Sequence, residues 1–240
     1  MVNNGVVIAT DKLVKKYPMG RRELVALHEV SLIFRRGEFA GLVGPSGSGK
    51  TTLLNIIGSL DVPTAGSATV LGNQVERLSH AQAAELRNHH IGFIFQTFNL
   101  LPVYTAFENV EFPLLLLGMS GADRRRAVMD ALEWVGLADR ARSKPAQLSG
   151  GEGQRVAIAR AMVKKPEIVL ADEPTANLDA ENSQNILHTM EKLNLDLGTT
   201  FVFSTHDQKV IEHLRRKIVL VDGKVAADER LQPEPERREQ

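Results

Sequence analysis

The chain has 240 residues, enough to bury the core of one large domain. Its 29 Lys and Arg residues balance its 29 Asp and Glu residues, so its charge gives no reason to expect a nucleic-acid partner. The lack of cysteine excludes disulfides, thiolate nucleophiles and zinc–cysteine sites, and it fits a reducing compartment.

Apolar segments in this chain are short. No run approaches the roughly 20 residues that are needed to cross a bilayer. The longest candidate, residues 112–117, contains Pro113. The first five residues show neither the basic nor the apolar region of a signal peptide. We therefore expect a soluble intracellular protein that contacts a membrane only through a partner.

Short strand-like runs separated by turns fill the first forty residues. They lie at residues 5–9, 25–27 and 30–34. We expect an antiparallel sheet that leads into the strand at 39–43. Four later runs are apolar and rich in β-branched or aromatic residues, as buried parallel strands are. These runs lie at residues 91–95, 168–171, 201–204 and 218–221.

Residues 44–51 read G-P-S-G-S-G-K-T, a complete phosphate-binding loop between an apolar strand and a helical segment. Its glycines let the backbone turn its N–H groups toward phosphate oxygens, and the helix start adds partial positive charge. Lys50 should reach the β- and γ-phosphates, and the Thr51 hydroxyl should bind Mg²⁺. The expected nucleotide-binding residues are Gly44, Pro45, Ser46, Gly47, Ser48, Gly49, Lys50, Thr51 and Thr52. The chain is predicted to bind a nucleoside triphosphate.

Helical patterning dominates residues 106–164. Within this stretch Val128, Leu132, Val135 and Leu137 fall on one face, which we expect to be buried. The arginine run at 124–126 is expected to be a solvated face.

A second glycine loop, L-S-G-G-E at residues 148–152, opens another helix. Ser149 can cap that helix, and the backbone N–H groups of Gly150 and Gly151 are suited to an anion. Only one phosphate loop supplies nucleotide, so this second anion site does not fit a simple nucleotidase.

Two adjacent carboxylates, Asp172 and Glu173, end the apolar strand at 168–171. In phosphate-loop enzymes an aspartate at this place holds Mg²⁺, which predicts that role for Asp172. Side chains alternate along a strand, so Glu173 should point elsewhere if the extended geometry persists. It would then be free to polarise the attacking water as a general base. Solubilising charge at a strand end is the alternative.

His206 follows the strand at 200–205 and precedes Asp207, which is predicted to begin a helix. It lies where ligands of open α/β sheets bind, so it can contact the γ-phosphate or the attacking water. An ordinary surface role is the alternative, and we prefer it for the other histidines. His206 and His213 lack the spacing of zinc ligands, and we find no other residues that complete a zinc site.

Together these motifs resemble those of the ATP-binding cassette (ABC) ATPases over nearly the whole chain. Residues 148–152 resemble the signature motif of that family, which is more specific than a phosphate loop. In the family two cassettes pack head to tail, and each ATP is held between the phosphate loop of one and the signature motif of the other. The resemblance implies a homodimer in which Ser149, Gly150 and Gly151 act in trans.

The resemblance also implies a fold: an α/β, phosphate-loop (RecA-like) core with an N-terminal antiparallel β subdomain and an inserted α-helical subdomain. We expect one domain over residues 1–229, with the helical subdomain at about 98–164. Residues 230–240 are polar and are expected to form a frayed tail.

Further site residues follow from the resemblance. Gln96 resembles the Q-loop glutamine that senses Mg²⁺ and the transmembrane partner, and residues 177–179 resemble the D-loop. Tyr17 resembles the aromatic residue that stacks on adenine, with a packed strand residue as the alternative. His206 resembles the switch histidine. The implied cofactors are ATP and Mg²⁺, with Thr51, Gln96 and Asp172 near the metal and Lys50, Gln96, Glu173 and His206 in catalysis.

Residues 58–66, 98–102, 105–110 and 113–116 resemble one branch in particular, the cassettes of lipoprotein-release and macrolide-export systems. That branch implies a permease with few transmembrane helices and a large periplasmic domain. It also implies a peripheral position on the cytoplasmic face of the inner membrane. Residues just after Gln96 would contact the permease, with packing inside the helical subdomain as the alternative for the apolar ones.

The sequence thus predicts an ATP-hydrolysing subunit of a membrane export or extraction complex. The alternatives are a soluble ABC-type ATPase without a transport role and a monomeric nucleotide-binding module. The chain has no long coiled-coil insertion and no basic patch, which disfavours the first. The signature motif disfavours the second.

Overall fold

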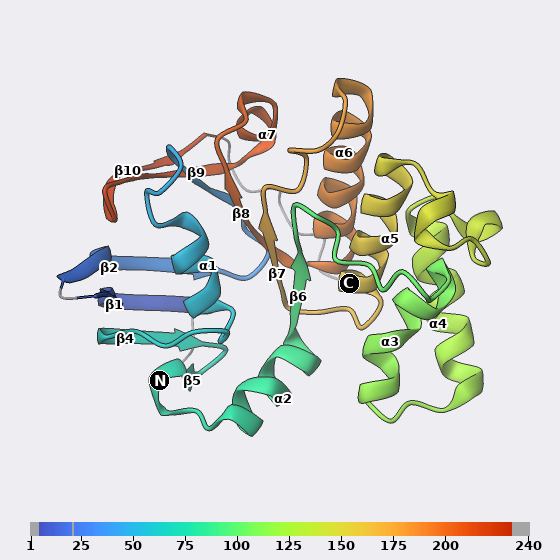
Figure 1. Ribbon diagram of the computed structural model, residues 1–240, viewed down its shortest axis with the longest axis horizontal. Coiled ribbons are helices and arrows are strands. Elements are labelled where there is room, and N and C mark those ends of the chain that lie inside the picture. The colour runs from blue at the N-terminus through green and yellow to red at the C-terminus, as the bar shows by residue number, and fades with distance from the viewer. Residues whose placement is uncertain (1–4, 21, 232–240) are drawn as a thin grey trace.

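The computed structural model describes residues 5–20 and 22–231. It contains two sheets with helices between and beside them (Figure 1). The strands are β1 (Val6–Met19), β2 (Arg22–Arg35), β3 (Phe39–Val43), β4 (Ala65–Val70), β5 (Asn73–Gln74), β6 (Ile91–Ile94), β7 (Ile168–Asp172), β8 (Thr200–Thr205), β9 (Arg216–Val221) and β10 (Lys224–Arg230). The α-helices are α1 (Lys50–Ile57), α2 (His80–His90), α3 (Ala106–Leu116), α4 (Gly121–Trp134), α5 (Gly150–Met162), α6 (Ala180–Leu197) and α7 (Gln208–His213). Short 3₁₀ turns are η1 (Val75–Arg77), η2 (Ala138–Arg140) and η3 (Pro145–Gln147).

The larger sheet has six strands in the order β10-β9-β3-β8-β7-β6. All neighbours from β9 to β6 pair in parallel, and β10 pairs antiparallel with β9 at one edge. The parallel strands are short and almost entirely buried, which explains their apolar composition. This arrangement confirms the predicted α/β class and the strands expected at 39–43, 91–95, 168–171, 201–204 and 218–221.

Alternating side chains divide this sheet into two packed faces. Phe39, Phe201 and Phe203 join the cluster that contains buried residues of α5 and α6. Ala40, Leu42 and Val202 instead join the cluster that contains α1 and the smaller sheet. Helices α1 and α5 therefore lie on opposite faces of the six-stranded sheet.

The smaller sheet has four antiparallel strands in the order β2-β1-β4-β5. The sequence predicted this antiparallel sheet, but it divided its first strands too finely. Residues 25–27 and 30–34 belong to one strand, β2, and β1 extends well past residue 9. Residues with positive φ, Lys12 (44°) and Glu29 (50°), interrupt the regular pattern inside these strands. Their register shifts hide the strand period from a sequence analysis.

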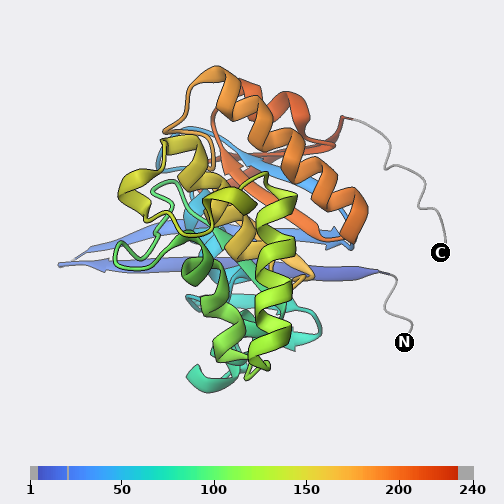
Figure 2. The ribbon, with the colours of Figure 1, turned by 90° about the vertical axis from the view of Figure 1, so that its right-hand side faces the viewer.

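Helices α3 and α4 lie side by side at one end of the molecule (Figures 1 and 2). Val128, Leu132, Val135 and Leu137 are buried there, as predicted. The arginine run is only partly solvated, because the Arg124 guanidinium donates to Glu111 at 3.0 Å. None of the helices within residues 5–20 and 22–231 has the length and apolarity needed to cross a membrane.

The predicted tail begins later than expected. Arg230 is the last residue of β10 and pairs with Arg216, and the Leu231 backbone N–H donates to the Arg215 carbonyl at 2.8 Å. The rest of the predicted tail, residues 232–240, lies outside the described residues.

Candidate nucleotide-binding site

Four segments singled out in the sequence follow four neighbouring strands of the parallel sheet. The phosphate loop follows β3, and His206 follows β8. Asp172 ends β7 and Glu173 follows it, and Gln96 lies two residues beyond β6. Because carboxyl ends of parallel strands share one edge, the topology collects these residues at a single edge of the sheet.

The phosphate loop has the backbone that its glycines predict. Gly47 and Gly49 have φ of 79° and 98°, in the left-handed region that disfavours side chains. Gly49 is the N-cap of α1, which has no side-chain cap and no acidic residue in its first turn. By contrast, Ser79, Thr105, Ser120, Ser149, Asp179 and Asp207 cap the other helices through their side chains. The start of α1 therefore keeps its N–H groups and partial positive charge for an external anion.

Lys50 is nearly buried, and its amine points back along the loop. The Nζ atom donates to the carbonyls of Gly44 at 2.7 Å and Pro45 at 2.9 Å. The fixed amine adds a full positive charge beside the helix start, which suits a polyphosphate.

Thr51 and Asp172, the two residues predicted to hold Mg²⁺ with oxygen atoms, lie together. The Thr51 hydroxyl is 3.2 and 3.1 Å from the two carboxylate oxygens of Asp172. A hydroxyl and a carboxylate at one point are the ligand types that Mg²⁺ prefers beside substrate phosphates. The residues therefore fit this cation.

Glu173 leaves the strand in an unusual conformation. Its φ is 46°, so the extended geometry on which the alternation argument depended ends at Asp172. Glu173 is mostly buried, and its Oε1 lies 2.7 Å from Nδ1 of the exposed His206. A strained backbone that aims a carboxylate at an imidazole is typical of functional sites. The sequence predicted both residues at this edge but not their contact.

Gln96 is exposed at the same edge, and its backbone carbonyl accepts a hydrogen bond from the Asn177 side chain at 2.9 Å. The Asn177 carbonyl in turn lies beside Gly150, where an added Cβ would be 3.9 Å from it. Segment 177–179 therefore lies between the Gln96 loop and the second glycine loop.

The second glycine loop is a helix start, as predicted. Ser149 caps α5 by accepting from the Glu152 N–H at 3.2 Å, and Glu152 accepts from the Ser149 N–H at 2.8 Å. That hydrogen bond lowers the pKa of Glu152, so its carboxylate stays charged. Helix α5 packs on the face of the sheet opposite to α1, so the two helix starts approach the sheet from different sides.

Gly153 has a packing role. A Cβ added there would lie 3.2 Å from the Phe98 ring, so glycine lets the loop after Gln96 approach α5 closely. Glycine costs about 1 kcal/mol inside a helix against alanine, but an alanine here would press on the Phe98 ring.

Tyr17 lies on β1, in the other sheet from the four-segment edge. Its hydroxyl donates to Asp61 at 2.9 Å. It also lies close enough to the Thr52 side chain for that group to act on its pKa. Partial burial and the hydrogen bond to Asp61 raise the pKa of Tyr17. The contact with Thr52 places the phenol beside the first turn of α1.

A groove of about 470 Å³ that the sequence did not predict lies between α2, β6, α3 and α5. Apolar side chains that include Phe93, Phe112 and Leu116 line it, and Arg160 and Lys164 lie among them. Burial lowers the pKa of both cations, that of Lys164 to about 8. The two basic residues belong to a segment with an amphipathic pattern, and such a pattern does not reveal that they line a groove.

Asn109 was also missed, although it falls on the buried stripe of α3 with Ala106, Val110 and Leu114. Its side chain is fully buried. The amide oxygen accepts from the Leu101 N–H at 2.8 Å, and the amide nitrogen donates to carbonyls of Leu101, Tyr104 and Thr105. One side chain thus fixes residues 101–105, where Val103 is exposed.

The chain matches the protein family described as "ABC transporter" over residues 27–176. It is 45% identical over 226 residues to the lipoprotein-releasing system ATP-binding protein LolD of Legionella pneumophila (strain Lens), covering 94% of this chain and 100% of that one. It is 44% identical over 229 residues to the macrolide export ATP-binding/permease protein MacB of Burkholderia pseudomallei (strain 1710b), covering 95% of this chain and 35% of MacB. The chain thus spans about a third of the length of MacB.

The fold is similar to that of the ATP-binding cassette MJ0796, which was solved as a dimer in a post-hydrolysis state bound to ADP and Pi. The TM-score is 0.87 at 43% identity, over 94% of this chain and 99% of that one.

Replacing Asn109 with Ala should lower the free energy of unfolding by about 1–3 kcal/mol, because the change leaves buried backbone groups of residues 101–105 unpaired. Urea denaturation measures the loss. Asn185→Ala, at an exposed position on α6, is the matched control and should change stability by no more than about 0.5 kcal/mol. Equal stability of the two variants would contradict the assigned role of Asn109.

Proposed function

This chain belongs to the ABC transporter family and has the fold of its ATP-binding cassettes, and from this premise we propose that it is the ATP-hydrolysing subunit of a transporter of the LolD and MacB type. In this proposal two copies close around ATP and drive a membrane permease in export or extraction. The single observation that carries the proposal is that two helices with glycine-rich starts, α1 and α5, pack on opposite faces of one sheet.

Two copies bring together what one chain keeps apart. In a head-to-tail dimer, Ser149, Gly150 and Gly151 of one copy face the γ-phosphate that lies on the phosphate loop of the other. ATP supplies the charge that both helix starts bind, so closure depends on nucleotide. The dimer of MJ0796 with ADP and Pi supports this assembly.

The residues at the sheet edge, together with Tyr17 on β1, have separate roles in ATP binding and hydrolysis. Lys50 and the backbone N–H groups of the phosphate loop, other than Pro45, hold the phosphates, and Tyr17 stacks on the adenine. Thr51 and Asp172 would hold Mg²⁺, with Gln96 nearby, and the ion would supply positive charge against the phosphate oxygens.

Glu173 acts as the general base and takes the proton of the water that attacks the γ-phosphorus; the bond to the bridging oxygen breaks and ADP leaves. His206, 2.7 Å from Glu173, orients that carboxylate and contacts the γ-phosphate.

The groove between α2, β6, α3 and α5 is the proposed docking site for the permease. Its apolar walls and the half-buried cations Arg160 and Lys164 fit a short amphipathic helix that carries a carboxylate. Both cations already donate to backbone carbonyls, Arg160 to Phe98 and Asn99 and Lys164 to Arg87 and Asn88. A partner carboxylate would favour the charged amine of Lys164, whose pKa burial lowers. MacB, whose name joins ATP-binding and permease parts, supports a permease of this kind as partner.

The alternative, a soluble ABC-type ATPase without a transport role, leaves the groove without an occupant. We further propose that residues 1–229 act as one domain with a helical subdomain at about 98–164, peripheral on the cytoplasmic face of the inner membrane.

Glu173→Gln should lower the rate of ATP hydrolysis by roughly 10²–10⁴-fold, the contribution typical of a general base. The same variant should elute as a dimer with Mg–ATP and as a monomer without nucleotide, because ATP stays bound between the copies. Phosphate release and size-exclusion chromatography with light scattering measure the two effects. Hydrolysis at the wild-type rate would show that Glu173 is not the general base. A monomer in saturating ATP would overturn the proposed head-to-tail dimer.

Ser149→Asp should retain the cap of α5, because aspartate is a good N-cap, while its charge repels the γ-phosphate of the opposite copy. We expect unchanged ATP affinity in the monomer and no ATP-dependent dimer. Lys50→Ala should instead lose ATP affinity. An equal mixture of these two inactive variants should recover hydrolysis, because a mixed dimer contains one site with both elements intact. If the mixture hydrolyses ATP no faster than either variant alone, the phosphate loop and the second glycine loop of one site would have to come from the same chain.

Replacing both Phe112 and Leu116 with Ala should weaken copurification with the co-expressed permease by about tenfold or more, since apolar anchors dominate interfaces. Hydrolysis by the free subunit should not change, because neither residue lies at the sheet edge. Leu195→Ala, at an exposed apolar position on α6, is the control. Undiminished copurification of the double variant would exclude the groove as the docking site.

A further inference from the structure

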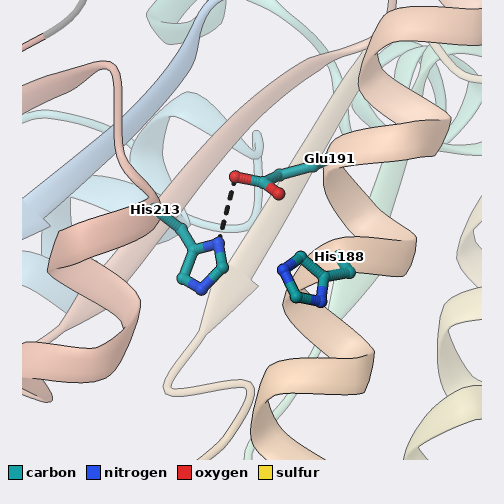
Figure 3. Close-up of side chains that lie close together, drawn as sticks. All are labelled: His188, Glu191 and His213. Carbon is teal, nitrogen blue, oxygen red and sulfur yellow. Dashed lines mark hydrogen bonds and ion pairs between the residues drawn. The ribbon is translucent and has the colours of Figure 1, made fainter.

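Away from the nucleotide site, three potential metal ligands converge between α6 and α7. His188, Glu191 and His213 each offer one ligand atom, and these atoms all lie within 4.8 Å of one another. Figure 3 shows the three side chains turned toward a common point, two from α6 and one from the end of α7. The sequence analysis considered His213 only together with His206, so it missed this cluster.

Each contact in the cluster suits a metal centre. His188 and Glu191 are three residues apart on α6 and therefore share one face. Glu191 Oε1 lies 3.0 Å from His213 Nδ1, and the rings of His188 and His213 are 5.2 Å apart at 74°. His188 is exposed, whereas Glu191 and His213 are half-buried. Packing therefore positions Glu191 and His213, and the exposed His188 side chain can move to complete the site.

We propose that His188, Glu191 and His213 form a binding site for a divalent transition cation such as Zn²⁺, with water as the fourth ligand. Two imidazoles and one carboxylate are a ligand set that Zn²⁺ adopts with an open position, and imidazole disfavours Mg²⁺ and Ca²⁺. Ligand atoms of a tetrahedral site lie about 3.4 Å apart for metal bonds of about 2.0–2.2 Å. The present ligand atoms lie within 4.8 Å of one another, so the three side chains would draw closer together around the cation.

The site joins two elements that lead out of the nucleotide site. Helix α6 begins after Asp179, and α7 begins directly after the His206–Asp207 pair. Helix α7 has only six residues, and its last residue is the ligand His213. A bound cation therefore anchors α7 to α6 and restrains the segment that follows His206.

Cobalt titration of the untagged, nucleotide-free protein tests the site directly. We expect one equivalent of Co²⁺ to produce the ligand-field absorption of a four-coordinate site, and Zn²⁺ to displace it. His188→Ala should weaken this binding at least ~10-fold, the loss typical even of residues that only support a metal ligand. His80→Ala, which removes an exposed histidine of α2, should bind as the wild type does.

Two further measurements distinguish this site from binding elsewhere on the chain. The carboxylate and imidazole of Glu173 and His206 offer a rival site, so a His206→Ala protein should retain the same stoichiometry and affinity. Zn²⁺ should also slow amide exchange in residues 208–213 of the wild type but not of His188→Ala. Equal binding by wild type and His188→Ala, or no four-coordinate spectrum in the wild type, would overturn the proposal and leave an ordinary Glu191–His213 ion pair.

Discussion

Parallel pairing of β3, β8, β7 and β6 is the constraint on which the nucleotide site depends. It aligns the carboxyl ends of four strands, so residues more than 150 positions apart in the chain, such as Thr51 and His206, meet at one edge. The strands are short and buried on both faces, which leaves the edge as the place where polar side chains emerge. The contacts Thr51–Asp172 and Glu173–His206 are direct results of this pairing.

The same sheet also separates the two helix starts that attract anions. Alternation along each strand sends one set of side chains to α1 and the other to α5 and α6. The uncapped, glycine-led start of α1 is suited to hold phosphate by itself. The start of α5 already carries a charged carboxylate, Glu152, in its first turn, so it is suited to complete a site rather than to create one.

Local signals made much of the fold and site predictable. The phosphate loop is recognised by the strand and helix beside it, and the carboxylates by the apolar run before them. Both patterns involve neighbouring residues, so the sequence alone shows them. The two long strands were not predicted, because left-handed residues at Lys12 and Glu29 break their period. The Glu173–His206 contact, the groove and the partnership of His188 with His213 join distant segments. No spacing rule identifies such contacts, since tertiary packing alone creates them.

Helix α5 is a continuous rod of 13 residues, about 20 Å long at 1.5 Å per residue. Ser149 and the two glycines are at one end, and Arg160 and Ala161, at the other, form part of the groove wall. Arg160 also clamps the carbonyls of Phe98 and Asn99. In the proposed assembly, a displacement of the groove in one copy would move α5 as a rigid helix. The start of α5 would then shift against the ATP held by the other copy. Each subunit would then respond to its own contact with the permease and act on the ATP bound to the other subunit. This arrangement would couple hydrolysis at the two sites.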